Sequence, residues 1–247
     1  MSVASETTGT SLGTALVTGA TSGIGRAAAL RLARDGWVVI VHGRNPERGA
    51  EVVRQINELG GRARFVAANL NDVAAVRTLV AEVGDVDVLV NNAGTAWFGP
   101  TADLDEKTFN DLFDGNVRSA YFLVAGIAPA MAERSSGSII NLASMAGQIG
   151  LDGGAAYGAT KASLSSMTRS WAAEFSPRGV RVNAIAAGPV LSTPERAPFI
   201  EQLGKTTPLG RGAHVDEIAE VISFLASDKA SYITGATLPA DGGRTAV

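Results

Sequence analysis

Short apolar runs recur along the chain, and longer amphipathic stretches separate them. Six runs are nearly continuous in Val, Ile, Leu and Ala, at 14–19, 37–43, 63–70, 86–94, 137–144 and 180–188. Because their apolar residues do not alternate with polar ones, each run fits a strand buried on both faces. The intervening stretches favour helices, for example at 25–34, 47–59 and 155–175. This pattern predicts an α/β fold: a Rossmann-type doubly wound parallel sheet of about seven strands, with helices on both faces.

The chain is long enough for one core. It has 247 residues, of which 46% are hydrophobic, and we expect a single domain over residues 13–247. The polar segment 1–12 is predicted to be a flexible tail. Four prolines gather at 189–208, where a long loop over about 189–210 is predicted to act as a substrate lid.

Composition excludes several classes of function. The net charge is −3 and no block of like charges occurs, so we expect neither a nucleic acid nor a membrane as partner. Cysteine is absent and His42 and His214 are the only histidines, which argues against a disulfide framework, a thiol nucleophile or a metal site. The first residues lack the charged and apolar regions of a secretion signal, so the predicted location is the cytoplasm.

A glycine-rich segment, TGATSGIGR, follows the first predicted strand and opens the next helix. Gly19, Gly23 and Gly25 allow a tight turn and let backbone N–H groups approach a pyrophosphate. The N-terminus of the following helix would stabilise that anion through its dipole. The spacing is G-x-x-x-G-x-G, and its position between strand and helix favours phosphate binding over a purely structural turn.

The end of the second strand, VHGRN, indicates which dinucleotide would bind. Sites that prefer NAD usually place a carboxylate here, whereas this chain has Gly43 followed by Arg44. A guanidinium matches a phosphate in charge and geometry, so Arg44 predicts NADP(H), with Asn45 or Ser22 as neutral donors. The alternative is that Arg44 is an ordinary solvated residue on a turn.

Tyr157 and Lys161 stand four residues apart and would share one face of a helix. A phenol with its ordinary pKa near 10 is a poor proton donor or base at neutral pH. A nearby ammonium favours the phenolate and moves the tyrosine pKa toward the working range. The small residues around the pair leave room for ligands.

Polar residues at other predicted positions complete the constellation. Ser144 ends the fifth strand, at the sheet edge where open α/β folds bind ligands. Asn116 falls in a predicted helix, where asparagine is intrinsically unfavourable, so we expect its side chain to make a polar contact. The NNAG turn at 91–94 closes the fourth strand and could line a cofactor.

These motifs together resemble the short-chain dehydrogenase/reductase family in its single-domain form, over residues 13–243. The matching segments, in chain order, are TGATSGIG, NNAG, Asn116, Ser144, the Y-x-x-x-K pair Tyr157 and Lys161, VNAIAAGPV and ITGATLPADGG. The more specific similarity is to 3-oxoacyl-(acyl-carrier-protein) reductases. That resemblance implies hydride transfer between a nicotinamide and a ketone or secondary alcohol.

The resemblance also implies residue roles. Tyr157 would exchange a proton with the carbonyl or alcohol oxygen, while Ser144 would hydrogen-bond the same oxygen. Lys161 would bind the nicotinamide ribose and lower the Tyr157 pKa, and Asn116 would hold a water that passes protons to Lys161. The cofactor-binding residues expected on these grounds are Gly19, Thr21, Ser22, Gly23, Ile24, Gly25, Arg44, Asn45, Asn69, Leu70, Asn92, Ala93, Gly94, Tyr157, Lys161, Gly188, Val190 and Thr193.

The sequence departs from the family pattern at several positions. Asn69 stands where the family commonly has an aspartate against adenine, and Ala187 replaces a usual proline. Thr193 matches a threonine that contacts the carboxamide, although neighbouring Ser192 leaves the register open by one residue. Basic residues that dock an acidic carrier in the related reductases are matched by Arg178 but only in part at Arg134.

The substrate pocket is predicted to be mostly apolar. The expected lining residues are Ser144, Ala146, Gln148, Trp97, Leu151 and Tyr157. Substrates could then be a carbonyl compound, such as a free ketone, sugar or fused-ring ketone, or an acyl thioester. The leading interpretation is an NADPH-dependent carbonyl or 3-oxoacyl reductase.

Two alternatives remain at this point. The enzyme could work oxidatively as an alcohol, sugar or steroid dehydrogenase, or the fold could serve a non-catalytic dinucleotide sensor. The complete set of Asn116, Ser144, Tyr157 and Lys161 argues against the sensor. Low charge and an alanine-rich 155–175 segment indicate self-association, and the resemblance implies a homotetramer.

Overall fold

The structure is a computed structural model that describes residues 11–247. At its centre lies a parallel sheet whose seven strands are β1 (Thr14–Val17), β2 (Val38–Gly43), β3 (Arg62–Ala67), β4 (Val88–Asn91), β5 (Gly137–Ser144), β6 (Val180–Ala187) and β9 (Thr237–Ala240). Across the sheet they follow the order β3-β2-β1-β4-β5-β6-β9, so the winding reverses between β1 and β4. The predicted doubly wound sheet is confirmed.

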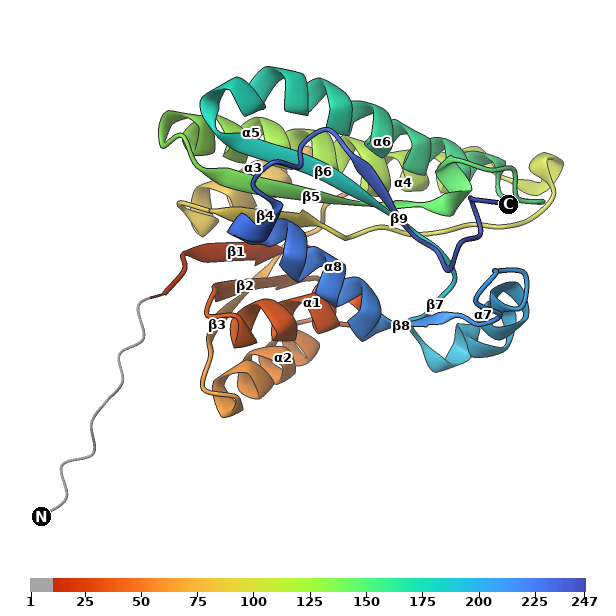
Figure 1. The fold of residues 1–247 in the computed structure, drawn as a ribbon, viewed down its shortest axis with the longest axis horizontal. Coiled ribbons are helices and arrows are strands. Elements are labelled where there is room, and N and C mark those ends of the chain that lie inside the picture. The colour runs from red at the N-terminus through yellow and green to blue at the C-terminus, as the bar shows by residue number, and fades with distance from the viewer. Residues whose placement is uncertain (1–10) are drawn as a thin grey trace, which may run out of the picture.

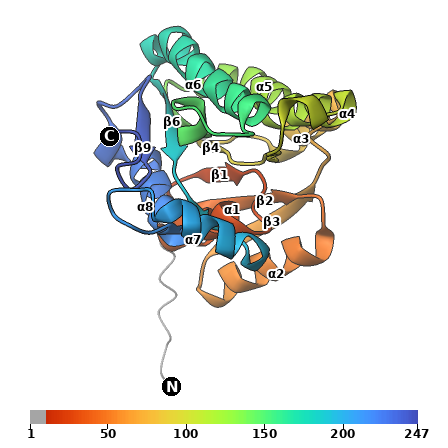
Figure 2. The same cartoon turned by 90° about the vertical axis from the view of Figure 1, so that its right-hand side faces the viewer.

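Helices cover both faces of this sheet (Figures 1 and 2). They are α1 (Gly23–Arg34), α2 (Pro46–Glu58), α3 (Val73–Val83), α4 (Glu106–Phe113), α5 (Ser119–Glu133), α6 (Ala155–Phe175), α7 (Ala197–Gly204) and α8 (Val215–Ala226). Leu32 of α1 and Ile222 of α8 belong to the core on one face, while Leu123 of α5 and Trp171 of α6 belong to the core on the other. Burial on both faces explains why the strands are continuously apolar.

Local chemistry sets the ends of the helices. Asn45 caps α2 by accepting a hydrogen bond from the Arg48 N–H at 2.8 Å, and Pro46 begins the helix with a suitable backbone angle. Gly60, just beyond α2, has a φ of +79°, a conformation that glycine adopts without strain. The predicted helices at 47–59 and 155–175 therefore match α2 and α6 closely.

The predicted lid contains more regular structure than the loop expected from its prolines. β7 (Val190–Leu191) pairs with β8 (Ala213–His214) to form a separate two-stranded parallel sheet, and the chain between the two strands forms α7, which lies beside them (Figure 1). The Arg211 guanidinium holds the Glu217 carboxylate through two bonds of 2.7 Å at the base of the lid. The Leu209 N–H donates to the Gly242 carbonyl at 3.1 Å, which ties the lid to the C-terminal segment.

The structure describes only part of the predicted N-terminal tail. Residues 1–10 of the expected tail lie outside the described part, and the division into tail, domain and lid stays a prediction. Between residues 11 and 247, no helix combines the length and apolar character needed to cross a membrane. The candidate active site gathers around the carboxyl ends of β1, β4 and β5, where the winding reverses.

Candidate active site

The glycine loop joins β1 to α1 and packs its backbone tightly. A side chain at Gly25 would strike the Gly19 carbonyl oxygen and the Asn92 amide nitrogen, so this position excludes any larger residue. Gly19 and Gly23 have φ values of +64° and +53°. Ser22 precedes α1 without a side-chain capping bond, and the first turn of α1 has no acidic residue. The N–H groups at this helix end can therefore donate hydrogen bonds to a bound anion.

The NNAG turn is bonded to the start of the glycine loop. Thr18 is buried, and its hydroxyl accepts hydrogen bonds of 3.0 Å from the N–H groups of both Asn92 and Ala93. The Asn92 amide donates to the Thr18 carbonyl at 2.8 Å. Asn92 thus braces the loop through its side chain, a structural contact in addition to its expected place beside a cofactor.

Arg44 follows β2 and is exposed, with no ion-pair partner among residues 11–247. The neighbouring Asn45 caps α2 with its side-chain oxygen, which accepts from the Arg48 N–H, and its side-chain NH2 remains the group that can donate to a ligand. Exposed Asn69 accepts a 3.2 Å bond from the Asn71 N–H, while Leu70 is buried in the core. The charge available for a phosphate at this end of the site is that of Arg44.

Ser144, Tyr157 and Lys161 lie together where β5 ends and α6 begins its first turns. Lys161 is buried, and its ammonium donates to the Leu142 carbonyl at 2.7 Å. The same ammonium lies 5.8 Å from the centre of the Tyr157 ring. Ser144 is nearly buried, and its hydroxyl accepts a bond from the Ala146 N–H at 3.2 Å. The predicted spacing therefore produces a cluster of hydroxyl, phenol and ammonium.

Burial acts on both titratable members of this cluster. It raises the pKa of the Tyr157 phenol above its usual value, an effect opposed by a hydrogen bond with Ser144 and by the charge of Arg196 in the lid. It lowers the pKa of the Lys161 ammonium to about 8. The sequence predicted that Lys161 would lower the Tyr157 pKa. In the structure the Tyr157 pKa is raised, because the cost of burying a phenolate is the largest effect on it.

Asn116 lies in a π-helical turn, Asp114–Arg118, between α4 and α5. It is buried, its oxygen accepts from the Thr95 N–H at 2.8 Å, and its amide donates to the Thr95 carbonyl at 2.8 Å and the Thr160 hydroxyl at 3.0 Å. The side chain therefore anchors the segment after β4, and its amide is already fully bonded. A side chain at Gly94 would lie 2.8 Å from the Asn116 oxygen and 3.6 Å from the Lys161 nitrogen, so Gly94 separates these two groups.

Two hydroxyl residues at the start of the lid, Ser192 and Thr193, have different neighbours. Ser192 approaches Gly23, where an added Cβ would be 3.3 Å from the Ser192 Cβ. Thr193 instead hydrogen-bonds Glu195 within the lid. The structure thus brings Ser192 against the glycine loop, and the expected contact of Thr193 with the carboxamide stays a prediction. Gly188 packs against Asp241, and Val190 is buried in the core.

Aromatic rings form the wall next to Tyr157. The ring centre of Phe98 lies 5.3 Å from that of Tyr157 and 6.1 Å from that of Phe199 on α7. Both phenylalanines are partly exposed, at 40% and 53%. The neighbouring Trp97, a predicted pocket residue, packs its ring on Gly99, and its place in the pocket stays a prediction.

The other predicted pocket residues divide by exposure. Ala146 is buried, Leu151 is half-buried against Gly154, and Gln148 is exposed. Thr160, which bonds Asn116, is a contact that the sequence did not indicate beforehand. Its only signal was its position next to Lys161.

The residues at the carboxyl ends of the strands fit a dinucleotide. The glycine loop packs so closely around Gly25 that it admits no side chain there, the α1 N-terminus offers N–H groups, and Arg44 offers an exposed positive charge. In the part of the chain that the structure describes, no cluster of three or more His, Asp or Glu side chains is arranged to hold a metal.

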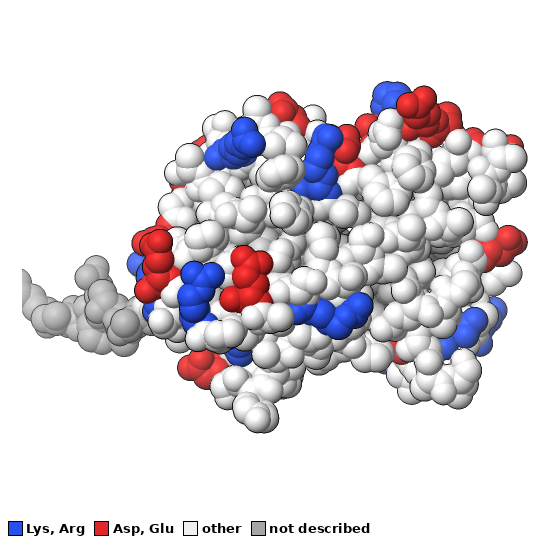
Figure 3. Space-filling model, turned by 90° about the horizontal axis from the view of Figure 1, so that it is seen from above, with Lys and Arg blue, Asp and Glu red and all other residues white. Residues whose placement is uncertain are grey.

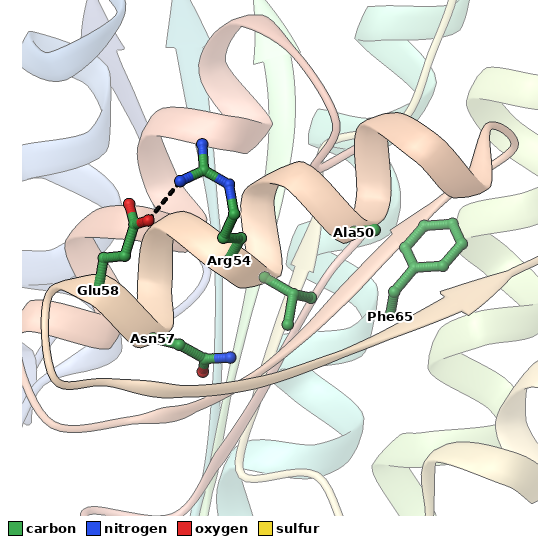
Figure 4. A pocket seen from close by; sticks show the side chains of 6 residues that line it. Ala50, Arg54, Asn57, Glu58 and Phe65 are labelled. Atoms are coloured by element: carbon green, nitrogen blue, oxygen red, sulfur yellow. Dashed lines mark hydrogen bonds and ion pairs between the residues drawn. The ribbon is translucent and has the colours of Figure 1, made fainter.

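A shallow groove lies elsewhere, between α2 and β3 (Figure 4). Its lining residues are Ala50, Val53, Arg54, Asn57, Glu58 and Phe65. An ion pair joins Arg54 to Glu58 across its rim. None of the six is a predicted site residue, and none offers the cluster of groups found at Ser144.

Known proteins resemble the chain over nearly its whole length. The model of the enoyl-(acyl carrier protein) reductase family matches residues 19–245. A 3-oxoacyl-(acyl-carrier-protein) reductase of Staphylococcus aureus is 39% identical over 237 residues, covering 93% of this chain and 96% of that protein.

Solved structures share the fold. One described as a short-chain dehydrogenase/reductase family protein is 47% identical with a TM-score of 0.89, covering 96% of this chain and 99% of the other. Another, from Beutenbergia cavernae with NADP bound at low occupancy, is 36% identical with a TM-score of 0.91, covering 96% and 98%.

These similarities extend over the glycine loop, the sheet, the Ser144, Tyr157 and Lys161 cluster and the lid. The family predicted from the sequence motifs is thereby confirmed, as is the prediction of an enzyme. The chain belongs to the short-chain dehydrogenase/reductase family and is an oxidoreductase that acts on carbonyl groups.

Proposed function

We propose that the protein reduces a ketone or a 3-oxoacyl thioester with NADPH, using Ser144, Tyr157, Lys161 and Asn116. The observation that carries this proposal is that the Lys161 ammonium lies 5.8 Å from the centre of the Tyr157 ring. The Ser144 hydroxyl forms a hydrogen bond with the same Tyr157 side chain. Such an arrangement can protonate an oxygen while charge develops on it.

The cofactor prediction is confirmed at the level of the family, because a structural neighbour carries NADP and the residues of the glycine loop fit a dinucleotide. In this chain Arg44 is the proposed partner of the 2′-phosphate. Its freedom from other ion pairs within residues 11–247 supports that role. When bound, the cofactor supplies the hydride that is added to the carbonyl carbon.

The residues of the chain handle the oxygen and its proton. Ser144 donates a hydrogen bond to the carbonyl oxygen, and Tyr157 transfers its phenolic proton to the same atom. The raised pKa of Tyr157 keeps that proton in place until the oxygen becomes basic. The Lys161 ammonium then stabilises the phenolate, and Asn116 holds the Thr95 segment beside the pair. In the oxidative direction the same groups act in reverse.

The aromatic wall favours substrates with an apolar body. Phe98 and Phe199 expose ring surface beside the proposed proton donor, and burying that surface under a substrate is favourable. A polyol would leave these rings without an apolar partner. An oxidative alcohol, sugar or steroid dehydrogenase is the second candidate, and the steroid case fits the same apolar surface.

A homotetramer is the proposed assembly. The outward side of α5 exposes Tyr121, Ala125 and Pro129, and α5 carries no charge before Glu133. The face seen from above is mostly uncharged, with Lys, Arg, Asp and Glu in small scattered groups (Figure 3). Light scattering that gave a monomer would contradict this proposal. The cytoplasmic location stays a prediction.

One experiment tests cofactor, direction and substrate together. The protein is offered NADPH with a panel of aryl ketones, fused-ring ketones, sugars and 3-oxoacyl thioesters, free and carrier-bound, and NADPH absorbance is followed. We expect turnover of ketones with apolar substituents and none with Tyr157→Phe. Activity confined to the reverse reaction, with NADP⁺ and an alcohol, would favour the dehydrogenase instead.

A further inference from the structure

His42 is a buried titratable residue for which the proposed mechanism has no use. It lies near the end of β2 and is 2% exposed. Its Nδ1 accepts a hydrogen bond from the Gly19 N–H at 3.3 Å, and its Nε2 lies 3.2 Å from the Ala68 carbonyl oxygen. Its own carbonyl accepts from the Ala20 N–H at 2.8 Å. One residue therefore contacts two segments that are far apart in sequence.

These contacts fix the chemical form of the ring. A nitrogen that accepts from Gly19 carries no proton, whereas a nitrogen facing a carbonyl must carry one, so the imidazole is neutral with its hydrogen on Nε2. Burial supports the same form, because it lowers the pKa of His42 to about 4. No charged side chain contributes to this shift, and only the Ala68 carbonyl opposes it.

The two bonded segments belong to opposite sides of the proposed adenosine site. Gly19 begins the glycine loop, and its carbonyl is held by the Asn92 amide at 3.3 Å while its N–H is held by His42. Ala68 immediately precedes Asn69 and Leu70, the segment expected at adenine. Arg44, the proposed partner of the 2′-phosphate, lies two residues beyond His42.

Building on the proposed function, we infer that His42 is a positioning residue for the adenosine half of NADP(H). Its imidazole joins the glycine loop to the segment after β3, and so sets the separation between the groups that bind pyrophosphate and those that bind adenosine. His42 acts through Gly19 and Ala68 and does not itself touch the cofactor. The nicotinamide half, served by Tyr157 and Lys161, is independent of this bond pair.

The test compares His42→Leu, which keeps bulk and loses both bonds, with His42→Gln, whose amide can accept and donate again. Binding of 2′,5′-ADP and NADPH is measured by calorimetry, and kcat is measured at saturating NADPH. Turnover with reduced nicotinamide mononucleotide, which lacks the adenosine half, gives a further readout. Val39→Ala, equally buried on β2, is the control for lost packing.

For His42→Leu we expect the Kd of both adenosine ligands to rise about tenfold, as the loss of one or two hydrogen bonds implies. We expect kcat at saturation and turnover with the mononucleotide to stay within about twofold, since the reacting groups lie elsewhere. His42→Gln should recover most of the affinity, and Val39→Ala should lower stability without changing Kd. If His42→Leu does not fold, His42→Asn, which lacks the reach for both bonds, replaces it in the comparison.

The inference is overturned if the Leu or Asn variant binds 2′,5′-ADP as tightly as the parent protein. It is also overturned if mononucleotide turnover falls as much as NADPH affinity, because that pattern indicates general damage. A parent protein that binds neither NADPH nor 2′,5′-ADP would instead refute the proposed function.

Discussion

The Lys161 ammonium lies 5.8 Å from the centre of the Tyr157 ring, one helical turn further along α6. The phenol therefore meets a positive charge within a buried cluster, next to the aromatic wall of Phe98. We therefore expect removal of the phenolic proton of Tyr157 to reduce catalysis strongly.

Replacing Tyr157 with phenylalanine removes the proton donor and keeps the ring. We expect kcat for ketone reduction to fall by about 10³-fold, within the range for losing a general acid. Fluorescence titration should give an unchanged Kd for NADPH. Tyr232→Phe, at a fully exposed tyrosine, is the matched control and should retain full activity. Substantial turnover by the Tyr157 variant would refute the assignment.

The pH dependence of reduction should report on Lys161. Burial lowers the pKa of this ammonium to about 8, so its charge is present at neutral pH and is lost as the pH rises through that value. We expect kcat/KM to decrease above about pH 8, since the phenolate then loses its stabilising charge. Lys161→Arg keeps the charge at higher pH and, where it retains activity, should move the decline upward. A profile that stays flat to pH 10 would contradict this role.

Arg44→Ala should change the choice of cofactor. Loss of a charge-assisted bond to the 2′-phosphate is expected to lower kcat/KM with NADPH by about 10- to 100-fold while leaving NADH unaffected. Arg62→Ala serves as control. Arg62 is also exposed, but it lies at the start of β3, at the amino end of the parallel strands, whereas Arg44 follows the carboxyl end of β2. An unchanged ratio of NADPH to NADH would mean that Arg44 is a solvated surface residue.

Asn116→Ala should unfold more easily and react more slowly. The substitution removes the hydrogen-bond partners of the Thr95 N–H and of the Thr95 carbonyl. We expect the free energy of unfolding to decrease by about 2 kcal/mol. Urea titration measures the stability, and steady-state kinetics measures the accompanying loss of kcat. If stability is unchanged, the amide contributes nothing to holding the segment after β4.

Stability at acid pH should depend on His42. Its pKa is lowered from 6.5 to about 4 in the folded protein, so below about pH 6.5 the unfolded chain binds a proton that the folded protein excludes. Between pH 6.5 and 4 this group should cost about 3 kcal/mol of stability. Urea titrations across this range should show a smaller loss for His42→Gln. Parallel curves for the two proteins would argue that the ring titrates normally.

Much of the fold was predictable because burial on both faces leaves a direct trace in the strands. The exception was β9, which contains Pro239 and lies at the edge of the sheet, where the apolar signal is weak. The α7 helix was also missed, since it has only eight residues and includes Pro198. Its sequence favours a loop, and its position is stabilised by tertiary contacts such as Phe199 on Phe98.

The site was predictable where one side chain carries the chemistry, as with Tyr157, Lys161 and Ser144. It was less predictable where side chains bond to backbone. His42 meets Gly19 and Ala68 only because the register of the sheet aligns their segments, and Asn116 meets Thr95 only after α4 folds back. No spacing along the chain encodes such pairs.

The bond from Leu209 to Gly242 has a practical consequence for handling the protein. Thr207 and Pro208 also pack against Gly242 and Gly243, so this C-terminal segment supports the end of the predicted lid. A purification tag fused after Val247 would therefore lie next to the segment that supports the predicted lid. Measured specificity is therefore best compared between proteins that carry the same residues after Val247.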